Sequence, residues 1–250
     1  MNRKHILTTL CASLLLFEYG AAYLLAAGGP KYEAIKLTES GTIIGVVRFD
    51  GPAPAPRSLE VSGDDKICHQ KPIPAEDLVV SSDGKIQWAV ASIKKIKKGK
   101  PFSVEDPENP VALNQKGCRF VPHVIVVPTG RTFRILNSDG ILHNTHLLPK
   151  KNGLWNKAMP PQVKHLDTKF KRSERIPVKC DVHAWMKGWI IVTDHPYCEV
   201  TGTDGTFRME NVPVGTQTLE VWHETLGKLK QQVTVKAGEE TALEFVFKKK

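Results

Sequence analysis

The sequence has few of the features that mark helical, catalytic or nucleic-acid-binding proteins. No stretch shows a convincing helical period, and aromatic residues make up only 7% of the 250 residues. Basic residues are not interleaved with aromatic ones as they are in single-strand nucleic-acid binders. No acid/base pair and no nucleophile with a partner stands out. We therefore expect neither an enzyme nor a nucleic-acid-binding protein.

Long apolar runs are also scarce, and the main one lies at the N-terminus. A short basic segment, residues 3–5, precedes an apolar run over residues 6–17, and small residues follow as far as Gly28. This pattern is typical of a secretory signal peptide, here residues 1–28. We expect export to the periplasm or cell envelope and no integral membrane span after cleavage. An uncleaved anchor reaching to Ala27 is the alternative.

Cysteine is rare, and one of the five cysteines, Cys11, lies in the signal segment. An oxidising compartment allows the other four to form disulfides. If Cys180 binds a metal, we expect Cys68 to pair with Cys118 and Cys198 to stay free. The alternative is a disulfide between Cys180 and Cys198, which would remove the thiolate that a metal needs.

Basic residues outnumber acidic ones, and the formal net charge is +9. Removing residues 1–28 takes away two basic residues and one acidic residue, which leaves +8. The basic residues are dispersed apart from Ile93–Lys100 and Lys248–Lys250. This charge favours solubility and steering, and it suits an acidic protein partner or an anionic surface.

The chain does contain many short apolar segments separated by turns. Alternation over residues 41–49 predicts a first strand, which the Pro-rich segment 51–56 ends. Residues 118–127 and 131–139 are expected to form a hairpin in a buried sheet. We predict an all-β fold in which a β-sandwich over residues 38–193 is followed by a small β-sandwich module over residues 194–250.

The residues that bear chemistry gather in the segment CDVHAWM, Cys180–Met186. Cys180, His183 and Met186 offer a thiolate, an imidazole and a thioether. His143, at the end of an apolar strand, adds a second imidazole. A Cys with two His in a plane and a weak axial Met is the arrangement of copper electron-transfer sites. Zinc is the alternative metal, but it gives Met186 no role.

These segments resemble the cupredoxins, the type 1 blue copper proteins. The resemblance lies in the Cys-x2-His-x2-Met spacing, which is that of amicyanin-type members, and in His143 followed by Asn144 after an Asn-x-Asp pattern. It implies a Greek-key β-sandwich and a copper site with four ligands, in which Asn144 ties the two ligand loops together. The ligands implied are His143, Cys180, His183 and Met186.

Three features depart from the cupredoxin pattern. Asp181 and Val182 stand where small and prolyl residues are common, which places a carboxylate close to the thiolate. His146 adds an imidazole that could ligate instead of His143. Residues 57–115 make a longer first section than a minimal cupredoxin needs. The other histidines are expected to be surface or hydrogen-bonded residues: His5, His69, His123, His165, His195 and His223.

The segment Thr201–Trp222 resembles the carboxypeptidase regulatory-like, transthyretin-like β-sandwich. The resemblance lies in its Thr-Asp-x-Gly-x-Phe and Val-Pro-x-Gly patterns. Residues 41–49 also look like the first strand of that family. The cupredoxin-like part could therefore be inserted into this module or share a sheet with it. Exported proteins that combine these features are labelled methylamine-utilisation-like, which implies a periplasmic redox setting.

The leading hypothesis is an exported type 1 copper protein that carries single electrons between periplasmic or envelope redox partners. One alternative is a metal-free cupredoxin-like module that contacts carbohydrate or protein. Another is a copper storage or delivery protein in which His146 or His69 supplies open ligands. Whether Cys180 is a free thiolate that takes copper discriminates between these hypotheses.

Overall fold

The computed structural model describes residues 32–62, 66–68, 71–103 and 105–248. The expected signal peptide, residues 1–28, and His69 lie outside these residues. All of the elements in the described ranges are strands, which confirms the all-β fold class. No helix within those ranges has the length and apolarity needed to cross a membrane.

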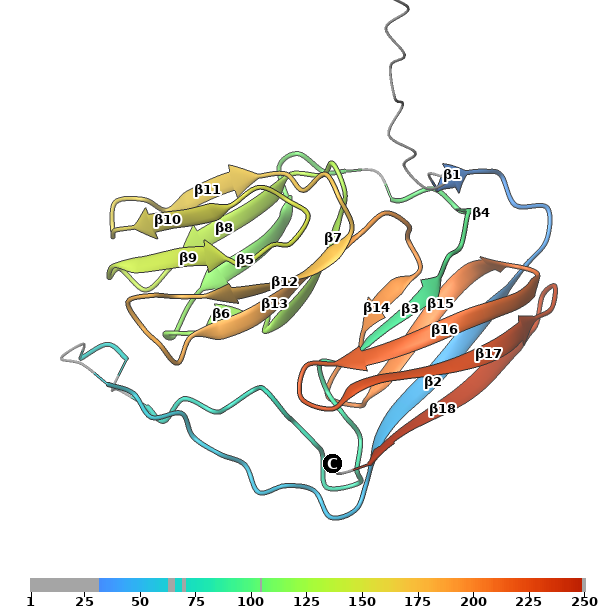
Figure 1. The fold of residues 1–250 in the computed structure, drawn as a ribbon, viewed down its shortest axis with the longest axis horizontal. Coiled ribbons are helices and arrows are strands. Elements are labelled where there is room, and N and C mark those ends of the chain that lie inside the picture. The colour runs from blue at the N-terminus through green and yellow to red at the C-terminus, as the bar shows by residue number, and fades with distance from the viewer. Residues whose placement is uncertain (1–31, 63–65, 69–70, 104, 249–250) are drawn as a thin grey trace, which may run out of the picture. The chain divides into compact units, whose positions relative to one another are not determined.

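The first β-sandwich consists of a five-stranded and a four-stranded sheet (Figure 1). In spatial order, the five-stranded sheet contains β10 (Trp155–Met159), β9 (His143–Leu147), β12 (Glu174–Lys179), β13 (Lys187–Thr193) and β7 (Val124–Pro128). The four-stranded sheet contains β11 (His165–Thr168), β8 (Phe133–Asn137), β5 (Val111–Gln115) and β6 (Phe120–Val121). Buried side chains of both sheets form one apolar cluster between them.

The second β-sandwich consists of a four-stranded and a three-stranded sheet. The four-stranded sheet contains β14 (Cys198–Val200), β3 (Val90–Lys94), β16 (Gly215–His223) and β17 (Gly227–Val235). The three-stranded sheet contains β15 (Thr206–Pro213), β2 (Ser40–Asp50) and β18 (Glu240–Lys248). A separate parallel pair joins β1 (Glu33–Ala34) to β4 (Lys98–Gly99).

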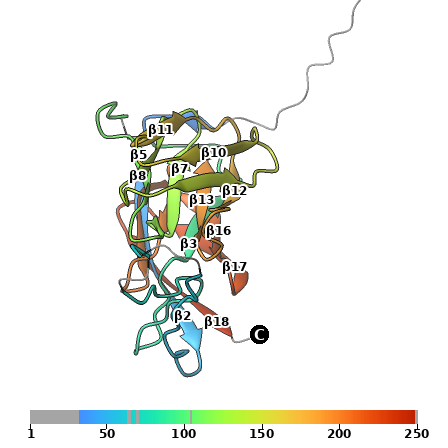
Figure 2. The same ribbon diagram turned by 90° about the vertical axis from the view of Figure 1, so that its left-hand side faces the viewer.

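The strand pairing corrects the expected start of the first domain at residue 38. β2 pairs with β15 and β18, and β3 pairs with β14 and β16. Figures 1 and 2 show β2, drawn in blue, beside β18, drawn in red. The first sandwich is therefore an insertion between β3 and β14 of the second sandwich. Alternation identifies a half-buried strand but does not identify its partner, so the sequence did not decide to which sandwich residues 41–49 belong.

The expected hairpin over residues 118–139 is wrong. β7 and β8 lie in different sheets, and the turn after Pro128 crosses from one sheet to the other. β7 pairs with β13 and β8 pairs with β5, both in parallel. The alternating burial of β8, whose first, third and fifth residues are buried, is the same for either arrangement, because both give the strand one core-facing side.

The cysteines pair as expected for a metal-binding Cys180. A disulfide joins Cys68 to Cys118, and Cys180 and Cys198 are free and buried. The alternative disulfide between Cys180 and Cys198 is therefore wrong. Burial raises the pKa of the Cys198 thiol to about 12, which leaves that thiol protonated and unreactive at neutral pH.

Candidate metal centre

Two antiparallel strands bring the candidate ligands to the same end of the five-stranded sheet. β9 begins at His143, and Cys180 directly follows the last residue of β12. Lys179 of β12 pairs with His146 of β9. Because the strands are antiparallel, the start of β9 lies beside the end of β12. Residues that are 37 positions apart in the sequence thus become neighbours.

The remaining candidates come from the loop between β12 and β13. The N–H of Cys180 donates to the carbonyl of Met186 at 3.1 Å, and the N–H of Met186 donates to the carbonyl of His183 at 2.9 Å. The first bond joins the two ends of the seven-residue loop, and the second forms a turn within its second half. The loop therefore holds its thiol, imidazole and thioether residues in one compact turn.

His143, Cys180 and His183 form a three-donor group in which all donor atoms lie within 4.8 Å of one another. The Nδ1 atoms of the two histidines are 2.9 Å apart, and Cys180 Sγ is 3.7 Å from His183 Nδ1. All three residues are at least 95% buried. The structure thus brings together three of the four residues that the sequence predicts as ligands.

This donor set fits a metal ion of the copper or zinc class. Metal bonds of about 2.0 Å to nitrogen and 2.3 Å to sulfur would separate the sulfur from a nitrogen by about 3.6–3.8 Å. The observed sulfur–nitrogen separation of 3.7 Å agrees with that span. The two nitrogens would part by about 0.5 Å, which a small ring rotation supplies. One thiolate and two imidazoles are the in-plane donors of a copper electron-transfer site.

Asp139 orients the His143 ring from the side away from Cys180. Its Oδ2 lies 2.9 Å from His143 Nε2, and its side chain is 6% exposed. A carboxylate only accepts hydrogen bonds, so Nε2 must carry the proton and Nδ1 faces the other candidate ligands. Metal-binding histidines are commonly held by a carboxylate in this way.

The electrostatics favour the thiolate form of Cys180. Burial acts to raise the pKa of this thiol, but the hydrogen bond with His143 and bonds from backbone N–H groups outweigh it, so the pKa lies below its ordinary value. Burial acts to lower the pKa of His143, but Asp139 and Cys180 together raise it to about 9. The thiolate is the form of cysteine that binds metals.

Asn144 ties the two ligand loops together, as the sequence predicts. Its backbone N–H points to Cys180 Sγ at 3.4 Å, and its side-chain oxygen accepts a hydrogen bond from the N–H of Asp181. Its amide group also donates to Asp181 Oδ2 at 3.1 Å. The loop that begins at Cys180 is thereby fixed to the first residues of β9.

Asp181 and His146 pair with each other beside the donor group. The His146 Nδ1 lies 2.9 Å from Asp181 Oδ2, and Lys179 Nζ lies 2.8 Å from Asp181 Oδ1. The ion pair with Lys179 is the main cause that lowers the pKa of the Asp181 carboxyl. The three-donor group does not include His146. The alternative that His146 ligates in place of His143 is therefore not favoured.

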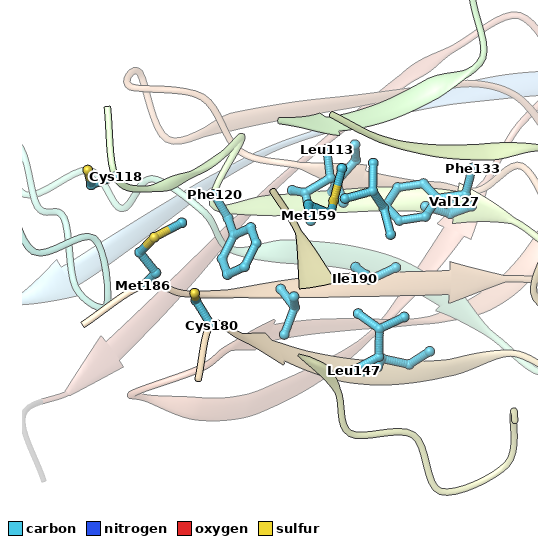
Figure 3. Close-up of a cluster of buried hydrophobic side chains, with 14 of the residues drawn as sticks. Leu113, Cys118, Phe120, Val127, Phe133, Leu147, Met159, Cys180, Met186 and Ile190 are labelled. Carbon is cyan, nitrogen blue, oxygen red and sulfur yellow. The ribbon is translucent and has the colours of Figure 1, made fainter. Parts of the chain in front are cut away.

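Met186 and Trp185 close the site from the core. Met186 is 1% exposed and belongs to the same apolar cluster as Cys180, and Figure 3 shows both side chains at one end of that cluster. The Trp185 ring lies on the His183 ring, with 5.0 Å between ring centroids, and its Nε1 donates to the carbonyl of Cys118 at 3.2 Å. Trp185 thus covers one side of the His183 ring.

One residue of the site, Asp139, was not assigned a role from the sequence, and the partner of His123, which lies outside the donor group, was also missed. Asp139 belongs to the Asn-x-Asp pattern, and its spacing of four residues from His143 across the Gly140 turn was the available signal. His123 was expected to be a surface or hydrogen-bonded residue. It is buried and pairs with Glu224, which is 101 positions away and could not be found by local pattern.

Comparison with known proteins found no matching family model and no curated protein of similar sequence. Several solved structures match part of the chain, and the following three are examples. The Cu-containing nitrite reductase from Thermus scotoductus SA-01 is 23% identical over 38% of this chain at a TM-score of 0.31, and the match spans only 25% of that protein. The purple cupredoxin from Nitrosopumilus maritimus is 16% identical over 33% of this chain and 99% of its own chain, with a TM-score of 0.29. Amicyanin from Paracoccus versutus is 18% identical over 36% of this chain and 86% of its own chain, with a TM-score of 0.30.

Proposed function

We propose that this protein is an exported type 1 copper protein that carries single electrons between redox partners. The observation that supports this proposal is the convergence of His143 Nδ1, Cys180 Sγ and His183 Nδ1 within 4.8 Å, with buried Met186 closing the same loop. A zinc site would use the thiolate and imidazoles but leave the thioether without a purpose. Copper accounts for all four residues.

Each residue has a defined part in this role. Copper, when bound, supplies a one-electron couple. Cys180 and His183 would hold it from the closed loop, His143 would hold it from β9, and Met186 would supply the thioether sulfur. Asn144 keeps the two ligand segments at a constant separation through its bonds to Cys180 and Asp181. A rigid ligand frame limits rearrangement when the charge of the metal changes.

Apolar side chains beside the ligands suit contact with a redox partner. Leu142 and Val182 directly precede His143 and His183, and they are 45% and 49% exposed. The basic net charge of the chain would steer an acidic partner towards such a surface. A carrier of this kind needs no catalytic residues, so we propose that the protein is not itself an enzyme. The N-terminal segment would direct it to the periplasm or cell envelope.

The absorption spectrum of the purified protein after addition of Cu(II) tests the proposal. We expect an intense blue thiolate-to-copper band in the wild-type chain, and its complete loss in Cys180→Ser. Cys198→Ser is the matched control, because Cys198 is the other free buried cysteine among the residues that the structure describes, and it lies outside the donor group. It should keep the band at an unchanged intensity per bound copper.

Two outcomes would contradict the proposal. A colourless wild-type protein with an accessible Cys180 thiol would favour the metal-free binding module. A coloured protein that loses its copper at each reduction would favour storage or delivery instead, because an electron carrier must hold its metal through repeated redox cycles.

A further inference from the structure

A second group of three donor residues lies on the other side of His143. Cys118, Asp139 and His143 offer a sulfur, a carboxylate oxygen and an imidazole nitrogen that all lie within 4.8 Å of one another. Cys118 and His143 are fully buried, and the Asp139 side chain is 6% exposed. In the structure the Cys118 sulfur is bonded to Cys68, so this sulfur is not available to a metal.

Backbone contacts hold this second group in place in addition to the disulfide. The N–H groups of Gly117 and Cys118 donate to Asp139 at 2.5 and 2.9 Å. Both residues have positive φ angles, 62° and 52°, so the turn between β5 and β6 aims two consecutive N–H groups at one carboxylate. The same carboxylate holds His143 Nε2 at 2.9 Å.

We propose that the Cys68–Cys118 disulfide gates a second metal site, made of Cys118, Asp139 and His143, which takes a thiophilic divalent cation such as Zn(II) when the disulfide is open. A dithiol reductant would open it: two electrons and two protons pass to the sulfurs of Cys68 and Cys118, and the reductant becomes a disulfide. The cation then displaces the proton of the Cys118 thiol. Thiolate, imidazole and carboxylate are all ordinary zinc ligands.

The two sites would compete for one imidazole ring. A neutral imidazole has one nitrogen with a free lone pair and one that carries a proton. With the disulfide closed, Asp139 holds the proton on Nε2, and Nδ1 faces Cys180 and His183. A cation bound at Nε2 displaces the proton from that nitrogen and leaves Nδ1 protonated, which removes His143 from the first site. The closed disulfide thus reserves His143 for the first site.

A matched pair of full-length variants tests this site, with Co(II) as the probe because its thiolate complexes absorb in the near ultraviolet. Both variants carry Cys180→Ser, which removes the thiolate of the first site. One adds Cys68→Ser and the other adds Cys118→Ser, so both lack the disulfide but only the first keeps the Cys118 donor. We expect one equivalent of Co(II) and a thiolate-to-cobalt band in the Cys68→Ser variant, displaced by Zn(II), and loss of the band in the Cys118→Ser variant.

The same Co(II) band in both variants, or its absence from a folded Cys68→Ser variant, would overturn the proposal. A second measurement uses the Cys180→Ser chain in sucrose, which favours the folded state once the disulfide is open. Its disulfide is reduced with a phosphine, the phosphine is removed, and Co(II) is added to the reduced and to the oxidised protein. A band confined to the reduced protein supports the site, and equal spectra reject it. Because neither experiment uses copper, failure here leaves the proposed electron-transfer function standing.

Discussion

At the scale of single residues, His143 has a partner at 2.9 Å on each ring nitrogen. Asp139 and His183 therefore determine together which nitrogen carries the proton and which one faces a metal. A histidine without such a pair of contacts can change its tautomer or ring orientation freely. The position of this one ring thus decides both the first donor group and the second.

His223 is the residue for which we predict a pH effect on stability. It is fully buried, and burial is the main cause that lowers its pKa from 6.5 to about 4. The charges of Glu224 and Asp77 raise this pKa, and His123 lowers it further. The unfolded chain therefore takes up a proton that the folded chain does not between about pH 6.5 and pH 4. The free energy of unfolding should fall by about 3 kcal/mol over this interval as a result.

Urea unfolding at several pH values measures this effect. His223→Gln should lose less stability than the wild type between pH 6.5 and pH 4. The exposed His165→Gln should follow the wild type. Parallel pH profiles for wild type and His223→Gln would show that His223 titrates normally in the folded protein.

At the scale of elements, β13 connects the ligand loop to the core of the first sandwich. It begins directly after Met186, pairs with β12 on one side and with β7 on the other, and approaches β7 closely at Gly188. A Cβ atom at Gly188 would lie 2.8 Å from the backbone oxygen of His123. That oxygen also accepts the N–H of Trp189 at 2.8 Å, so it cannot move without breaking the ladder.

We predict that Gly188→Ala destabilises the protein by about 1–3 kcal/mol, the usual cost of overpacking a closely packed position. Gly153→Ala is the matched control, because a Cβ there would meet no atom within 4 Å and the backbone is not in the left-handed region. Urea unfolding compares the two. Equal midpoints for the two variants would mean that β13 and β7 can separate at little cost.

At the scale of the whole molecule, a disulfide crosslinks the segment between β2 and β3 to the inserted sandwich. Cys68 belongs to that segment, Cys118 belongs to the turn between β5 and β6, and the two are 50 positions apart. The disulfide therefore links the segment that connects β2 to β3 in the second sandwich to the turn beside the donor residues of the first sandwich. A crosslink of this span restricts the unfolded chain considerably.

We predict that Cys68→Ala together with Cys118→Ala lowers the free energy of unfolding by about 4 kcal/mol, the loop-closure entropy for a loop of this length. Thermal and urea unfolding measure the loss. The chemically reduced wild type is the control, since it lacks the crosslink but keeps both side chains, and it should lose a similar amount. A loss below about 1 kcal/mol would show that the unfolded chain is already restricted in this region.

The sequence by itself determined the donor types and the fold class. The Cys-x2-His-x2-Met spacing places three donors in one short loop, and alternation along residues 41–49 and 133–137 shows that strands with one buried face form the core. Both signals are local, because loop length and the two-residue period of a strand depend only on neighbouring residues. The position of His143 was predicted wrongly, because it was expected at the end of the strand over residues 131–136, whereas it begins a separate strand, β9, after β8 ends at Asn137.

Only the tertiary structure decided which segments meet. The insertion of the first sandwich between β3 and β14, the placement of β7 and β8 in different sheets, and the pairing of His123 with Glu224 all join residues that local pattern does not connect. The position of Cys118 beside Asp139 and His143 is of the same kind. Strand alternation reports that a face is buried but not against what it is buried, so partners, sheets and the second donor group follow from the fold of the whole chain.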